Sequence, residues 1–135
     1  MRAMTFSAPL LLLVSHSVLA ACTGQEQLGQ VDYATNSSYF AAGATAELDK
    51  ISQQTQQKGQ GYVVLEFNLH PVINDKKLQQ YNLWLANRRL ERVKQYLNKT
   101  KVAAPIVTLI KTAAPAEQRQ VEILWCSLSS DIAMN

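Results

Sequence analysis

The chain has 135 residues, hydrophobic side chains at 47% of positions and a formal charge of +3. This length and composition predict one globular domain with an ordinary core, and so small a net charge excludes nucleic acid as the expected partner. The two histidines, His16 and His70, are far apart, and no metal-binding spacing of His or Cys occurs. No nucleophile stands beside a base, and no pair of carboxylates is evident. We therefore predict no metal, no cofactor, no catalytic residue and a function other than catalysis.

The first residues predict a secretory signal. Arg2 is followed by an apolar segment from Phe6 to Leu19, which polar residues and a proline interrupt. This segment is too short and too broken to span a bilayer, and two alanines follow it. We expect residues 1–21 to be removed at export.

The cleavage region Leu19-Ala20-Ala21-Cys22 resembles the lipobox of bacterial lipoproteins. The resemblance implies cleavage before Cys22 and fatty acylation, palmitate included, of its thiol and new amino group. Several chains are needed for stable anchoring, because each buried methylene contributes only about 0.8 kcal/mol. Thr23, in place of an aspartate, implies sorting to the outer membrane with the domain in the periplasm. The alternative is an ordinary signal followed by a chance cysteine.

Lipid on Cys22 would leave Cys126 without a partner inside the mature chain. Cys126 ends the strand-like run Val121 to Cys126, so we expect it to be a buried small hydrophobe. A disulfide to another chain is the alternative.

The remaining elements follow from hydrophobic spacing and turn residues. Residues 22–30 are polar and predict a lipidated tether, and residues 129–135 predict a tail. Strands are expected at 31–35, 62–69, 106–110 and 120–128, and helices at 44–57 and 75–98. This alternation predicts an α+β domain over 31–128 in the order β-α-β-α-β-β, a two-layer sandwich with both helices on one face of a mixed four-stranded sheet.

The second predicted helix is the longest element. It contains neither Gly nor Pro, and Asn74 or Asp75 could cap its start. Apolar residues recur along it at three- and four-residue intervals, which predicts one face turned to the core. These residues are Leu78, Leu85 or Ala86, Leu90, Val93 and Leu97. Basic residues lie beside this face, at Arg88, Arg89, Arg92 and Lys94, where a carboxylate could be met.

Two stretches resemble the OmpA-like peptidoglycan-binding domain, which peptidoglycan-associated lipoproteins also carry. Tyr81-Asn82, Leu85-Ala86, Arg89-Leu90, Val93 and Tyr96-Leu97 are similar to the family pattern Y-N-x-x-L-S-x-x-R-A-x-x-V-x-x-Y-L. Gln118 to Ile123 is similar to the family's closing N-R-R-V-E-I. The resemblance covers Val31 to Trp125 and implies a pocket for the diaminopimelate residue of the peptide stem. It implies that Arg89 binds a carboxylate, that Asn82 is the family's asparagine, and that Arg119 is the first arginine of the closing motif.

The expected acid of this pocket is missing from its usual place. No G-x-T-D follows the second strand, and Asn74 or Asp75 is the nearest substitute. A pocket without its carboxylate holds an ammonium poorly. The sequence therefore favours an interaction subunit of a cell-envelope assembly (secretion, pilus or flagellar), with Trp84 and Phe67 as interface residues. The alternative is peptidoglycan binding that links the outer membrane to the cell wall.

Overall fold

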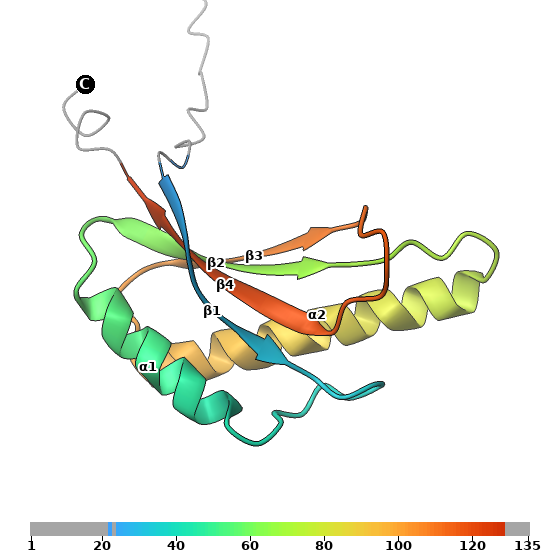
Figure 1. The fold of residues 1–135 in the computed structure, drawn as a ribbon, viewed down its shortest axis with the longest axis horizontal. Helices are drawn as coiled ribbons and strands as arrows, with labels where there is room; N and C mark the ends of the chain where they lie inside the picture. The colour runs from blue at the N-terminus through green and yellow to red at the C-terminus, as the bar shows by residue number, and fades with distance from the viewer. Residues whose placement is uncertain (1–21, 23, 129–135) are drawn as a thin grey trace, which may run out of the picture.

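A computed structural model describes residue 22 and residues 24–128. The elements follow one another as predicted, β-α-β-α-β-β (Figure 1). They are β1 (Gly24–Asp32), α1 (Ala44–Gln56), β2 (Gly61–Asn68), α2 (Lys76–Lys99), β3 (Ile106–Lys111) and β4 (Gln120–Ser127). The predicted signal at 1–21, Thr23 and the predicted tail at 129–135 lie outside the described residues.

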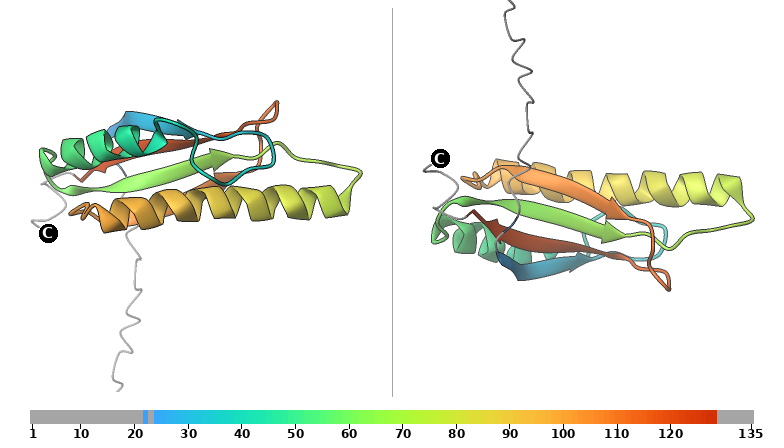
Figure 2. Two further views of the ribbon diagram at one scale, coloured as in Figure 1. Left: turned by 90° about the horizontal axis from the view of Figure 1, so that it is seen from below. Right: turned by 90° about the horizontal axis from the view of Figure 1, so that it is seen from above.

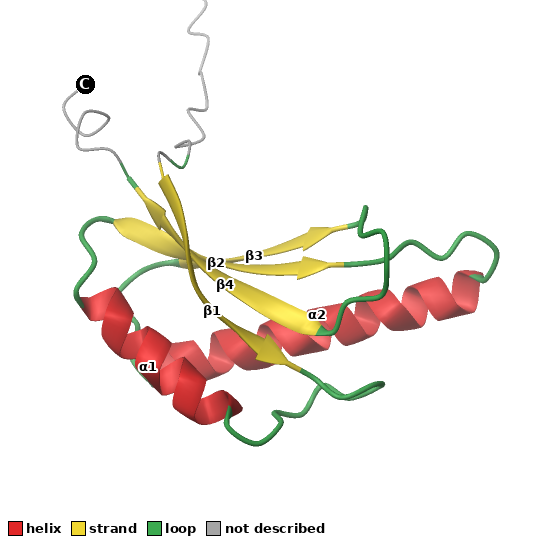
Figure 3. Cartoon of the chain, in the orientation of Figure 1, coloured by secondary structure: helices red, strands yellow, loops and turns green. Residues whose placement is uncertain are grey.

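The four strands form one mixed sheet in the order β1-β4-β2-β3. β4 runs antiparallel to both β1 and β2, whereas β2 and β3 are parallel and are joined through α2. Both helices cover the same face of the sheet, so the molecule has two layers (Figures 2 and 3). The predicted α+β sandwich is confirmed.

The core lies between this sheet face and the two helices. Alternate residues of β2 and β4 point into it, and both helices contribute fully buried aliphatic side chains. The predicted stripe on α2 is buried except at Leu78, which is 43% exposed. Leu78 lacks a core partner because the first turns of α2 extend past the ends of the strands (Figure 1).

The start of the domain differs from the prediction. β1 begins at Gly24 rather than Val31, so most of the expected tether is a strand paired with β4. This edge strand carries mostly exposed side chains and a register shift between Gln27 and Gly29. Its sequence therefore shows no apolar alternation. A side chain at Gly29 would clash with Glu47 and Ile51 of α1, which explains why glycine stands there.

The expectation that Cys126 lacks an internal partner is also wrong. Cys22 and Cys126 form a disulfide with a Cα–Cα distance of 5.4 Å. The pairing follows from strand register, because Gly24 lies opposite Ser127 and Cys22 comes two residues before Gly24. A sulfur in this bond cannot also carry a thioether-linked lipid.

α2 begins at the predicted cap and remains amphipathic throughout. The Asp75 carboxylate accepts a hydrogen bond from the Leu78 backbone N–H at 3.0 Å.

Within residues 22 and 24–128, no helix is both long and apolar enough to cross a membrane.

Candidate functional site

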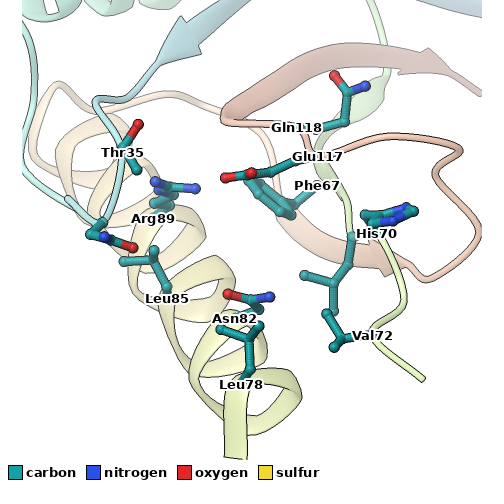
Figure 4. A pocket seen from close by; sticks show the side chains of 12 residues that line it. Thr35, Phe67, His70, Val72, Leu78, Asn82, Leu85, Arg89, Glu117 and Gln118 are labelled. Carbon is teal, nitrogen blue, oxygen red and sulfur yellow. The ribbon is translucent and has the colours of Figure 1, made fainter. Parts of the chain in front are cut away.

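A pocket of about 300 Å³ lies where β2 ends, between α2, the segment after β1 and the segment before β4 (Figure 4). Its wall is partly apolar, with polar groups contributed by each of these segments. The lining residues are Thr35, Asn36, Phe67, Leu69, His70, Val72, Leu78, Asn82, Leu85, Arg89, Glu117 and Gln118.

Arg89 forms the inner end of the pocket and is only 3% exposed. Its Nε donates to the Ser37 carbonyl at 2.9 Å, and Nη2 donates to the Ala34 carbonyl at 3.1 Å. The guanidinium also stacks on two rings, 5.2 Å from the centre of Tyr33 and 5.7 Å from that of Phe67. Arg89 thus holds the segment after β1 against α2.

These contacts leave part of the Arg89 guanidinium available to a ligand. Burial lowers the pKa of Arg89, and the nearby Tyr33 and Glu117 act in the opposite direction. An arginine nevertheless stays protonated at neutral pH. A guanidinium has five N–H donors, and those on Nη1 donate to no other residue of the described chain. Arg89 can therefore still bind an anion that enters the pocket.

The pocket contains a carboxylate that sequence reasoning missed. Glu117, in the loop between β3 and β4, is exposed and lines the pocket. Its carboxylate extends toward the side where Arg89 lies, with the Phe67 ring beside it (Figure 4). Within the described chain Glu117 has no ion-pair partner. The available signal was its position directly before the closing motif, which begins at Gln118 and leads into β4 at Gln120.

Asn82 and His70 add further polar groups to the pocket. Asn82 lines the pocket, as the family resemblance implies. His70 Nδ1 lies 2.7 Å from the Ala114 carbonyl oxygen. Because a carbonyl only accepts, Nδ1 carries the proton, and Nε2 remains for a ligand.

The two residues predicted to replace the missing acid lie elsewhere. Asp75 caps α2 and does not line the pocket, and neither does Asn74. Their separation from Arg89 follows from the length of α2, since Asp75 stands almost four turns before it. Arg119 does not line the pocket either, and its Nη1 donates to Oγ1 of the lining residue Thr35 at 3.2 Å.

The two residues predicted as interface anchors have different environments. Trp84 is 53% exposed on α2. Phe67 is 2% exposed, belongs to the core and supports Arg89, so it offers no surface to a partner. The described residues contain no cluster of His, Cys, Asp and Glu suited to a metal ion.

No protein-family model matches this sequence, and no curated protein matches it. Solved structures do match. The periplasmic domain of Helicobacter pylori MotB is 14% identical, with a TM-score of 0.53 over 81% of this chain and 75% of that one. The OmpA-like domain of FopA1 from Francisella tularensis is 15% identical, with a TM-score of 0.50 over 74% of this chain and 72% of that one. These likenesses show that the chain has the OmpA-like fold in a divergent form.

Proposed function

We propose that this chain is a cell-envelope binding module whose pocket takes the zwitterionic end of diaminopimelate in a peptidoglycan stem. The observation that carries the proposal is the presence of Arg89 and Glu117 in one open pocket. A free α-amino carboxylate needs one cation and one anion at its binding site, and these two residues supply both.

Each charged residue of the pocket is proposed to bind the oppositely charged group of the ligand. The Nη1 group of Arg89 meets the ligand carboxylate, because Nε and one N–H of Nη2 already donate to backbone carbonyls. Glu117 meets the ligand ammonium in place of the acid that usually follows the second strand. Asn82 and His70 Nε2 complete the polar lining. The shift of the acid to the loop before β4 lets the site keep its charges without the G-x-T-D motif.

The experiment is a pull-down with purified sacculi. We compare the wild-type chain, Glu117→Gln and Glu26→Gln. Glu26 is a matched control because it is an exposed glutamate paired with Lys58, outside the pocket lining. Retention of the wild type and of Glu26→Gln, with release of Glu117→Gln, supports the site. Equal retention of all three overturns it.

The compartment and the anchor are part of the proposal. The disulfide suits the oxidising periplasm. We therefore assign the chain to the periplasm with Cys22 as a structural cysteine, after an ordinary signal. The alternative form, an outer-membrane lipoprotein with acylated Cys22, excludes that disulfide. Intact mass separates them, because the disulfide form is lighter by two hydrogens and the lipoprotein heavier by its acyl groups.

A second candidate function is an interaction subunit of an envelope assembly. β3 is an edge strand of the sheet, and its outward-facing Val107 and Leu109 are 47% and 42% exposed. An apolar edge strand of this kind can pair with a strand of another chain. Purification of a stoichiometric complex that Leu109→Lys disrupts would support this function, and a solitary monomer would contradict it.

A further inference from the structure

The side of α2 turned away from the sheet carries an unusual set of exposed side chains. Trp84 lies near its middle, 53% exposed, with the Tyr81 ring centre 5.8 Å away. The guanidinium carbon of Arg88 lies 5.7 Å from the Trp84 ring centre. Contacts of this kind hold the indole in place although it lacks a core partner.

A second pair of the same type continues this surface. Arg92 lies one turn beyond Arg88 and stacks over Tyr39, 4.4 Å from the ring centre. Its Nε also donates to Ser38 Oγ at 3.2 Å. Tyr39 itself is 70% exposed. We call Tyr39, Tyr81, Trp84, Arg88 and Arg92 together the outer ridge.

Charge is distributed very unevenly around the molecule. From Lys76 to Lys101 the chain holds eight Lys and Arg residues and only Glu91 as an acid. The rest of the described chain holds four basic and eight acidic residues. The outer ridge therefore lies on a strongly positive helix, while the remaining surface is negative, so an anionic partner would bind with the ridge facing it.

The shape of the ridge indicates which anionic partner fits. α2 has 24 residues, a rod of about 36 Å. The depression beside Arg88 and Arg92 measures only about 130 Å³, smaller than ordinary ligand pockets, so this side of α2 offers no deep site. Cations along a convex rod match a plane of phosphates better than a single carboxylate, and Trp and Tyr favour the interface between headgroups and acyl chains.

We propose that the outer ridge of α2 docks on an anionic phospholipid surface. The proposal goes beyond the binding of the peptidoglycan stem, because it concerns another side of the same helix. Trp84 and Arg89 are five residues apart, which corresponds to about 140° around a helix. A lipid surface centred on Trp84 therefore lies on another side of α2 than Arg89, so the proposal has the domain bind a membrane and the cell wall together.

The test uses the exported chain and two kinds of vesicle, phosphatidylcholine alone and an equal mixture with phosphatidylglycerol. The chain has two tryptophans, and Trp125 is 3% exposed. A blue shift of fluorescence therefore reports on Trp84. We expect a blue shift with the anionic vesicles only, and weaker binding as salt is added.

Variants make the test specific. Arg88→Gln with Arg92→Gln should weaken binding to anionic vesicles roughly 30-fold. Lys50→Gln with Lys58→Gln removes the same amount of charge from α1 and the segment after it, outside the outer ridge, and should leave binding within about twofold of the wild type. Glu117→Gln should bind vesicles normally, which separates this proposal from that of the pocket.

Three results would overturn the lipid proposal. One is the absence of a blue shift with anionic vesicles. Another is equal loss of binding in the two double variants, which would indicate a general charge effect. The third concerns the Trp84→Ala variant. If this variant still bound anionic vesicles but no longer bound sacculi or an acidic protein, the ridge would be assigned to that other partner.

Discussion

Cys22 and Cys126 are 104 residues apart in sequence, and their disulfide joins the residues before β1 to the end of β4. β1 is an edge strand with one hydrogen-bonded neighbour and few buried side chains. The bond therefore fixes the strand that has the least packing to hold it.

We predict that loss of this disulfide destabilises the domain. Cys22→Ser with Cys126→Ser should lower the free energy of unfolding by about 2–5 kcal/mol, because a long loop of the unfolded chain is no longer closed. Urea unfolding of the wild type with and without a reductant measures the same effect. The double variant should show no response to the reductant. An unchanged midpoint in reduced wild type would contradict a structural disulfide.

Arg89 should be needed for folding as well as for binding. Arg89→Ala leaves the carbonyls of Ala34 and Ser37 without their donors and should cost about 3–5 kcal/mol of stability. The matched control is Arg88→Ala, an exposed neighbour on the same helix, which should change stability by no more than about 0.5 kcal/mol. Thermal unfolding of both variants decides this. Similar midpoints would show that the carbonyl contacts contribute nothing.

The stability of the domain at alkaline pH should depend on the buried hydroxyl of Tyr33. Burial raises the pKa of Tyr33 above its ordinary 10.0, against the opposing charges of Arg89 and Arg92. Above that ordinary value the unfolded chain loses the proton while the folded chain keeps it. Stability is therefore fully present below pH 10 and falls as the pH rises, by at most about 1.4 kcal/mol per pH unit.

Tyr33→Phe provides the control for this effect. It removes the hydroxyl that donates to the Arg89 carbonyl at 3.1 Å, which should cost about 1 kcal/mol at neutral pH. The alkaline slope of its unfolding free energy should be shallower than that of the wild type. Identical slopes would show that other tyrosines cause the alkaline loss.

Asp75 should act as a helix cap and not as the pocket acid. Asp75→Ala should lower stability by about 1 kcal/mol, and Asn74→Ala by less than about 0.5 kcal/mol. Asp75→Asn should keep both the cap and the affinity for the stem peptide. Weaker ligand binding by the stable Asp75→Asn protein would restore Asp75 as the acid of the site.

Periodicity predicted the elements that the core holds and failed where an element is exposed. α2, β2 and β4 bury regular apolar faces, so their spacing was visible in the sequence. β1 is an edge strand of glutamine and glycine that takes its shape from pairing with β4, and nothing in residues 24–30 shows this locally. The pairing of Cys22 with Cys126 could not be predicted either, because strand register, which brings the two together, is a tertiary property.

The sequence predicted the residues that α2 contributes to the pocket but not the carboxylate. Arg89 and Asn82 belong to the helix pattern and lie in the pocket. Glu117 comes from a loop whose path depends on the ends of β3 and β4, so counting along the chain from β2 could not find it. Leu78 shows the converse, because the overhang of α2 beyond the sheet exposes a residue that spacing alone cannot separate from the core.

The most direct test of the central claim is a calorimetric titration with two soluble stem peptides. One ends in diaminopimelate, whose side chain ends in a free amino group and a free carboxylate. The other carries lysine in its place, which keeps the side-chain ammonium and lacks the side-chain carboxylate. We predict measurable binding of the diaminopimelate peptide, loss of binding with the lysine peptide, and about tenfold weaker binding by Glu117→Gln but not by Glu26→Gln. Equal affinity of Glu117→Gln and the wild type for the diaminopimelate peptide would contradict the account.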